Sequence, residues 1–259
     1  RIKDVTKQHI RNYHSSLQHI PYEANRRLSL LSKLFNFAID ELEWLPSGNN
    51  PAQGVKKYPE PPRRRYLSEK EFARLGEALS QASAGEFNRS FSVHAIAAIR
   101  LLIFTGARTG EILQLRWSNV NYERKCLELS DSKTGAKDIQ LSAPAMQILS
   151  ELPRYEDNPY VIIGNKPGRH LVNVKDTWRF IREKAGISDV RIHDVRHSFA
   201  SVTASAGTGL TIIGALMGHK SVMTTARYAH LSSDPLQAAS EAAGAKLELA
   251  LNGRINAQG

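Results

Sequence analysis

The sequence predicts a mainly α-helical protein with one small antiparallel β-sheet, an α+β fold. Apolar residues recur at three- and four-residue intervals through most of the 259 residues, as they do on the buried faces of helices. One pair of short segments instead alternates apolar and polar residues around a polar turn, which is typical of a β-hairpin. The chain has room for one large domain and a smaller companion, and its 41% hydrophobic residues can fill a core.

The charge balance favours an anionic partner. The formal net charge of +10 indicates nucleic acid first and a membrane surface second. No apolar run is long enough to cross a bilayer and no signal peptide opens the chain, so we expect no membrane association and a cytoplasmic, nucleoid-associated location. The single cysteine, Cys126, fits a reducing compartment. The chain starts at Arg1, already in helix-prone sequence, so we expect that a natural N-terminal part is missing.

Residues 1–57 predict a small helical module. A short helix follows the N-cap segment Asp4-Val5-Thr6, and a longer one covers residues 22 to about 44 before a Pro- and Gly-rich stop. Residues 1–66 hold twelve Lys or Arg against six Asp or Glu, more than half of the chain's excess positive charge. A Pro-rich basic strap, residues 58–66, follows, and a solvated linker explains it as well as a phosphate-binding segment does. The candidate DNA-binding residues of this part are Arg26, Arg27, Lys33, Arg63, Arg64 and Arg65.

The larger domain is expected over residues 67–231. Ser68 and Glu71 form a capping-box pattern, and residues 93–104 predict a helix buried in the domain centre. That helix breaks at two glycines that flank Arg108, which would present this arginine at the start of a new helix, although a surface capping charge is the simpler explanation for an isolated arginine. Residues 125–129 and 138–141 predict the hairpin. Scaffold follows, with helices near residues 145–152 and 174–184 and a short strand at 160–163.

Residues 192–231 place His193, His219, Arg196, Arg227 and Tyr228 around an apolar helical core. A guanidinium can bind two phosphate oxygens, an imidazole can move one proton, and a phenol can act as a nucleophile. Each residue alone would more often be a packing or surface position. A zinc site is the competing interpretation, because His193 and His197 are four residues apart. However, Asp194 stands where zinc enzymes usually have Glu, and no cysteine cluster or third ligand supports a metal.

Three boxes resemble the tyrosine recombinase (phage integrase) family. HDVRHSFAS followed by LMGHKSVMTTARYAHL is similar to the family's H-x-x-R, G-H and nucleophilic Tyr signature, and TGARTGEILQLRW is similar to its first-arginine box. The hairpin turn resembles T-K-[TN]-x-K, whose first lysine corresponds to Lys133, while Lys137 remains a competing candidate. The resemblance covers residues 1 to about 231 and is weak before Tyr66.

The resemblance implies a recombinase catalytic fold behind a helical core-binding domain, and it implies the role of each site residue. Arg108 and Arg196 would clamp the scissile phosphate, His219 would donate a further hydrogen bond, and Glu111 would support an arginine. Tyr228 would attack to form a 3′-phosphotyrosyl bond, with His193 accepting or orienting its proton. Lys133 would protonate the leaving 5′ oxygen. No metal, cofactor or ATP is expected in this chemistry.

The expected partner is double-stranded DNA, held between the two domains by the basic linker. The resemblance implies four protomers on two DNA sites, a monomer in free solution, and accessory DNA-bending proteins as possible partners. Residues 232–259 predict a tail helix, and the resemblance implies that it docks on a neighbouring protomer; a frayed end is the alternative, because the helix has few large apolar residues. The favoured function is the integrase of a mobile element. The alternatives are a Xer-like chromosome-dimer resolvase, a type IB topoisomerase-like enzyme and, from another class, an inactive DNA-binding regulator. The full set of expected catalytic residues argues against the last.

Overall fold

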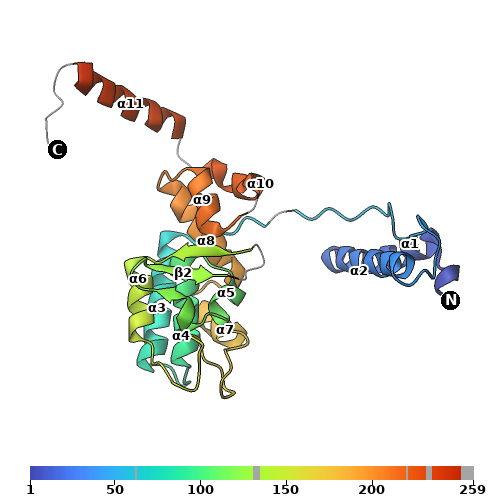
Figure 1. Ribbon diagram of the computed structural model, residues 1–259, viewed down its shortest axis with the longest axis horizontal. Coiled ribbons are helices and arrows are strands. Elements are labelled where there is room, and N and C mark those ends of the chain that lie inside the picture. Colours follow the sequence, from blue (N-terminus) through green and yellow to red (C-terminus); the bar gives the residue numbers. More distant parts are fainter. Residues whose placement is uncertain (62, 131–134, 220, 232–234, 252–259) are drawn as a thin grey trace. The chain divides into compact units, whose positions relative to one another are not determined.

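The computed structural model describes residues 1–61, 63–130, 135–219, 221–231 and 235–251 (Figure 1). The chain divides into two compact units, Arg1–Arg64 and Arg65–Gly259, each with its own hydrophobic core. Among the described residues, no helix is both long and apolar enough to cross a membrane.

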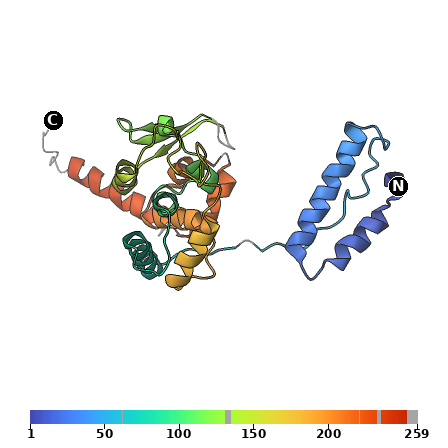
Figure 2. The same ribbon diagram turned by 90° about the horizontal axis from the view of Figure 1, so that it is seen from below.

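The small unit is a helical hairpin. A short 3-10 turn, η1 (Ile2–Asp4), precedes α1 (Lys7–Ser16) and α2 (Pro21–Asp40), which lie side by side (Figure 2). Thr6 caps α1 as expected, accepting a hydrogen bond from the backbone N–H of His9 at 3.3 Å. The expected extension of α2 to about residue 44 is wrong. Glu43 adopts a left-handed backbone (φ 52°), and the N–H of Trp44 turns back to the carbonyl of Ala38.

The start of the Pro-rich strap packs against the small unit. The Asn25 side chain accepts a hydrogen bond from the Tyr58 backbone N–H and donates to the Tyr58 carbonyl, both at 2.9 Å. Asn25 also donates to the Glu60 carboxylate, and the Tyr58 ring stacks on His14 with centroids 4.4 Å apart. The small unit therefore includes the first part of the segment expected as a linker, and the boundary between the two compact units falls between Arg64 and Arg65 in the sequence.

The large unit is a helical domain built around α4 (Val93–Thr105), whose side chains are mostly buried, as its apolar sequence predicts. α3 (Glu69–Ala84), α6 (Ala143–Glu151), α7 (Lys175–Lys184) and α8 (Ile192–Ser205) all pack against α4. The remaining helices bear or follow the candidate site: α5 (Thr109–Leu113), α9 (Leu210–Met217), α10 (Val222–Thr225), the 3-10 helix η3 (Ala226–Leu231) and the tail helix α11 (Pro235–Leu251).

The sheet is small and antiparallel, as expected, and contains one strand more than the hairpin. A 3-10 turn, η2 (Trp117–Asn119), precedes the strands β1 (Val120–Asn121), β2 (Cys126–Leu129) and β3 (Lys137–Gln140) in the chain. The three strands pair in chain order. Leu127 pairs with Ile139, and both side chains are buried. The strand expected at 160–163 is wrong, because Tyr160 and Ile163 make only isolated bridges to different partners.

Candidate active site

Arg108 is positioned by a glycine turn and a carboxylate. Gly106 ends α4 in a left-handed conformation (φ 60°), and a Cβ there would lie 2.4 Å from the Phe199 ring, so only glycine fits. Arg108 follows at the N-cap of α5. The Glu111 carboxylate accepts hydrogen bonds from both the backbone N–H and the guanidinium of Arg108, each at 2.9 Å. The guanidinium is thereby aimed at the Gly218 carbonyl, 3.5 Å away.

Arg196 is buried on α8 and joins segments that are far apart in the sequence. Its guanidinium donates to the Gly106 carbonyl at 2.5 Å and to the Met217 carbonyl. Burial and the nearby Arg108 charge lower the pKa of Arg196 to about 10, so the side chain stays cationic at neutral pH. The first-arginine turn and the end of α9 are therefore held around one buried positive charge.

His219 follows the left-handed C-cap Gly218 and is oriented by α10. Its Nδ1 lies 2.9 Å from the hydroxyl of Thr225, which is itself buried. Burial, together with the charges of Arg196 and Arg108, lowers the pKa of His219 to about 4. The imidazole is therefore neutral near pH 7. If the Thr225 hydroxyl donates to Nδ1, the ring proton lies on Nε2, which is then a hydrogen-bond donor for a phosphate oxygen.

Lys137, on β3, is the hairpin lysine that the structure places in this cluster. Its ammonium lies 2.8 Å from the Glu111 carboxylate, and only 12% of the side chain is exposed. A Cβ on Gly218 would come within 3.0 Å of the Lys137 side chain, so the lysine packs directly on that glycine. Burial lowers the pKa of Lys137 despite the partly opposing effect of Glu111. Lys133, the expected proton donor, lies outside the described residues.

Tyr228 lies in η3 and is fully buried. Its hydroxyl lies 2.6 Å from His197 Nδ1, whereas His193 was expected to be its partner. His193 is exposed, and its ring meets His197 edge to face with centroids 4.9 Å apart. Thr225 is a site residue that motif reasoning missed, and His197, which was expected only to pack or cap beside the site, contacts the Tyr228 hydroxyl. For His197 the available signal was its place directly after Arg196, one turn of helix from His193.

Gly218 is the point where these side chains converge. Arg108 and Lys137 both reach it, Arg196 binds the preceding carbonyl, and His219 follows it. Glu111 is the carboxylate at the centre of the cluster, and burial would raise its pKa. The hydrogen bonds from Lys137 and Arg108 outweigh burial and lower the pKa below its usual value. Preorganised cationic donors of this kind are suited to hold a phosphate and to stabilise the negative charge that develops on it.

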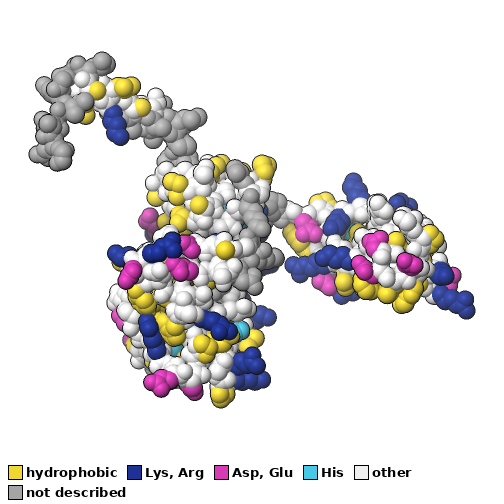
Figure 3. Space-filling view, viewed as in Figure 1, with side chains coloured by type: hydrophobic (Ala, Val, Ile, Leu, Met, Phe, Trp, Pro, Cys, Tyr) yellow, Lys and Arg dark blue, Asp and Glu magenta, His cyan; other side chains and the backbone are white. Residues whose placement is uncertain are grey.

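The expected DNA-binding residues fall into two groups. Arg26 and Lys33 line a shallow hollow on the small unit beside Lys57, and Lys and Arg side chains are spread over that unit's surface (Figure 3). Arg27 pairs with Glu23 at 3.0 Å on the same helix. Of the strap residues, Arg63 and Arg64 are exposed. Arg65 instead pairs with Glu71 at 2.6 Å and Asp189 at 2.7 Å, so its charge is already used within the large unit.

The fold and this cluster define a helical domain that arranges arginines, a lysine, histidines and a tyrosine for binding a phosphate. The chain belongs to the phage integrase family, the tyrosine recombinases, and the family model matches residues 65–234. The shufflon-specific DNA recombinase of Escherichia coli is 30% identical over 207 residues, which cover 79% of this chain and 50% of that protein. Tyrosine recombinase XerA of Pyrococcus furiosus is 32% identical over 154 residues, or 56% of this chain and 53% of that protein. The chain thus spans about half the length of these two relatives.

Solved structures share the fold. The Tn1549 transposon integrase in complex with transposon right end DNA superposes with a TM-score of 0.69 at 16% identity, covering 94% of this chain and 87% of that one. The site-specific recombinase XerH, bound to a palindromic difH substrate, gives a TM-score of 0.67 at 19% identity over 93% of this chain and 73% of the other. The expected fold class, a tyrosine recombinase catalytic domain behind a small helical domain, is confirmed.

Proposed function

We propose that this protein breaks and rejoins DNA strands through a tyrosine intermediate. The observation that carries the proposal is the convergence of Arg108, Arg196, His219 and Lys137 at Gly218, next to the segment that bears Tyr228. Cleavage of a phosphodiester spreads negative charge over its non-bridging oxygens, and fixed cationic donors stabilise that charge. Relatives named as DNA recombinases and structural neighbours bound to DNA support DNA as the substrate.

In the proposed reaction the Tyr228 oxygen forms a bond to phosphorus while the bond to the 5′ oxygen breaks. Arg108 and Arg196 clamp the non-bridging oxygens and His219 donates a third hydrogen bond. The phenol proton leaves to an imidazole, His193 in our expectation, and the 5′ oxygen takes a proton from Lys133, or from Lys137 as the alternative. One phosphodiester is exchanged for a bond of about the same kind, so a new 5′-hydroxyl can reverse the step without ATP.

Integration or excision of a mobile element is the favoured biological setting, and the likeness to a transposon integrase supports it. Chromosome-dimer resolution is the alternative supported by the Xer relatives. A type IB topoisomerase-like activity would relax supercoils without joining two sites, so assaying both reactions separates these candidates. An inactive DNA-binding regulator would bind DNA but form no covalent adduct.

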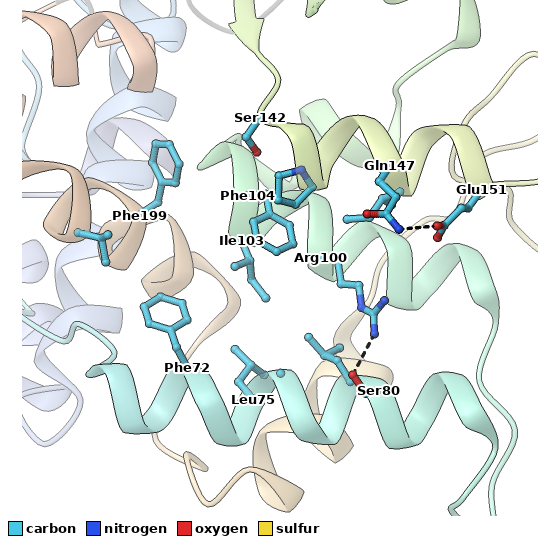
Figure 4. Close-up of a pocket in the computed structure, with 15 residues that line it drawn as sticks. Phe72, Leu75, Ser80, Arg100, Ile103, Phe104, Ser142, Gln147, Glu151 and Phe199 are labelled. Carbon is cyan, nitrogen blue, oxygen red and sulfur yellow. Dashed lines mark hydrogen bonds between the residues drawn. The ribbon is translucent and has the colours of Figure 1, made fainter. Parts of the chain in front are cut away.

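We also propose assembly of four protomers on two DNA sites through the tail helix α11. The large unit carries an open apolar groove of about 840 Å³ between α3, α4, α6 and α8 (Figure 4). Phe72, Leu75, Ile103 and Phe199 line it, together with the charged side chains of Arg100 and Glu151. Leu247 and Leu249 on α11 are each more than half exposed and, being two residues apart, lie on different sides of the helix. Burying the leucine on one side of α11 from a second copy in this groove would remove apolar surface of both the helix and the groove from water.

The deciding experiment uses a pool of nicked duplexes with randomised sequence, in which the short strand beyond the cut diffuses away and traps the covalent intermediate. We expect wild-type protein to give an SDS-resistant protein–DNA adduct in the presence of EDTA, and Tyr228→Phe to give none while still shifting the pool in a gel. Sequencing the trapped strands would also identify the site. Adducts formed by Tyr228→Phe at the wild-type level would exclude the proposal, and binding without wild-type adducts would favour the regulator.

A further inference from the structure

The buried position of Tyr228 is incompatible with direct attack on DNA. Its side chain has no exposed surface and belongs to a small second core of the large unit, formed with Ala200, Ala204, Ile213 and Met217. A DNA phosphodiester is charged and much larger than a water molecule. It therefore cannot reach the Tyr228 oxygen, which is not accessible even to water. The Tyr228 hydroxyl must therefore leave this position before it can attack phosphorus.

The hydroxyl is stored against a specific partner. His197 Nδ1 lies 2.6 Å from the Tyr228 oxygen, a distance typical of a strong hydrogen bond. If the phenol donates to Nδ1, the neutral imidazole of His197 carries its own proton on Nε2. Burial raises the pKa of Tyr228 to about 12, and burial with the neighbouring His193 lowers the pKa of His197 to about 4. The proton therefore remains on the phenol, and this pairing holds an unactivated nucleophile.

We propose that the His197–Tyr228 hydrogen bond is a resting latch, which keeps the nucleophile buried and protonated until DNA is engaged. The inference rests on the proposed function, because it assigns Tyr228 as the nucleophile. His197 is a positioning residue in this account: release breaks a hydrogen bond and moves the ring, while the phenol keeps its proton until attack. The family signature assigns catalytic roles to His193 and Arg196 and none to His197. The hydrogen bond to Tyr228 gives His197 its role as a positioning residue.

The latch is joined to the interdomain segment. The Tyr66 ring lies against Tyr228 with centroids 6.2 Å apart. The backbone N–H of Leu67 donates to the hydroxyl of Ser198 at 2.9 Å, directly beside His197 on α8. Arg65 fixes the same segment by donating to the Tyr66 carbonyl at 2.6 Å and to Glu71. Residues 65–67, which are the end of the basic strap and the residue after it, are thus attached to the core that holds Tyr228. A displacement of the strap by DNA would be transmitted to the Tyr228 pocket through these contacts.

The latch is tested in the free protein by nitrating tyrosines with tetranitromethane and mapping the products by mass spectrometry. Tyr155 and Tyr22, which are 52% and 46% exposed, serve as internal standards. We expect Tyr228 of the wild type to be strongly protected relative to both. In His197→Ala the hydroxyl loses its acceptor, which should raise nitration of Tyr228 about five- to hundredfold. His197→Asn, whose side-chain oxygen can still accept the hydrogen bond, should restore most of the protection.

Tyr66 provides a matched pair of variants. Tyr66→Ala removes the ring that covers Tyr228 and should increase its nitration, whereas Tyr66→Phe keeps the ring and should leave the protection unchanged. Circular dichroism melts show that each variant is folded under the nitration conditions. The latch is excluded if Tyr228 of the wild type nitrates as fast as Tyr155, or if His197→Ala is as protected as the wild type.

A covalent-trapping arm separates this inference from the proposed function. With the trapped duplex saturating, the His197→Ala adduct should form at least as fast as the wild-type adduct, since the stored state is weakened. A general base would give the opposite result, a rate loss of about a hundredfold or more, and would overturn the latch. If no variant forms an adduct but Tyr228 protection follows His197 as expected, the proposed function fails and the latch stands as a packing interaction of Tyr228.

Discussion

The Lys137 ammonium and the Glu111 carboxylate lie 2.8 Å apart and are both nearly buried, with 12% and 9% of their side chains exposed. The same Glu111 oxygen also accepts a hydrogen bond from the Arg108 guanidinium. One carboxylate therefore holds two cations that would otherwise repel each other at the edge of the proposed phosphate site. This shared contact links the hairpin to the first-arginine turn, which the sequence places far apart.

Replacing Glu111 should weaken both stability and function. Glu111→Ala removes the carboxylate that contacts both partly buried cations, so we expect the free energy of unfolding to fall by about 2–4 kcal/mol, below the range for fully buried pairs because Arg108 is a quarter exposed. Glu111→Gln keeps one acceptor oxygen and should lose about half as much. Urea denaturation measures both changes. Equal stability of Glu111→Ala and wild type would contradict the structural role.

A change of leaving group can show whether Lys133 or Lys137 protonates the leaving 5′ oxygen. A substrate with sulfur in place of the 5′ bridging oxygen needs no proton donor, so it should rescue cleavage by a variant that lacks the general acid. We expect rescue of Lys133→Ala and no rescue of Lys137→Ala, because the Lys137 ammonium is bound to Glu111. Single-turnover adduct formation on sulfur and oxygen substrates gives the comparison. Rescue of Lys137→Ala alone would assign the proton to Lys137 instead.

Thr225 should matter through His219. Thr225→Val keeps the side-chain size but removes the hydroxyl that lies 2.9 Å from His219 Nδ1, so the imidazole loses its fixed tautomer and orientation. We expect adduct formation to slow about tenfold, with DNA affinity unchanged. Thr225→Ser retains the hydroxyl and should stay near the wild-type rate. If Thr225→Val cleaves as fast as Thr225→Ser, the contact does not orient the imidazole.

The proposed tail docking predicts a specific assembly defect. Val202 lines the groove and is 55% exposed, so Val202→Arg should fold normally while placing a charge where α11 leucines are proposed to bind. We expect the four-protomer complex in gel shifts to be lost and single-site binding to remain, as for deletion of residues after Leu231. Val172→Arg, at an 80% exposed position outside the groove, is the control. Intact tetramers with Val202→Arg would remove the groove from the proposal.

Stability should fall on mild acidification. The pKa values of His197 and His219 are lowered from 6.5 to about 4, mainly by burial. Between these values the unfolded chain binds protons that the folded chain does not, so the free energy of unfolding decreases as pH falls from about 6.5 towards about 4. Glu71, whose pKa is lowered from 4.5 to about 2, adds a loss only below about 4.5. Denaturation between pH 6.5 and 4.5 therefore isolates the histidines, and His219→Asn should reduce the slope.

Local structural features could be predicted from the sequence wherever residues close together in the chain determine them. The caps at Thr6 and Ser68 are short-range hydrogen bonds, and the burial of α4 follows from its nearly uniform apolar composition. The three family boxes were readable for the same reason, since each is a contiguous run. The sequence overextended α2 and predicted a strand at 160–163, because a left-handed Glu43 and isolated bridges depend on packing that periodicity does not encode.

By itself, then, the sequence determined the helical character, the small sheet, the family and the residue types for phosphate chemistry. Only the tertiary structure decided which of those residues touch. It placed Tyr228 on His197, Lys137 on Glu111, and Arg65 on two carboxylates. These partners are separated in the chain by 31, 26 and as many as 124 residues. Over such sequence separations, a side chain's partner depends on how the helices pack and on the free energy of burying each charge. The spacing of residues in the sequence predicts neither.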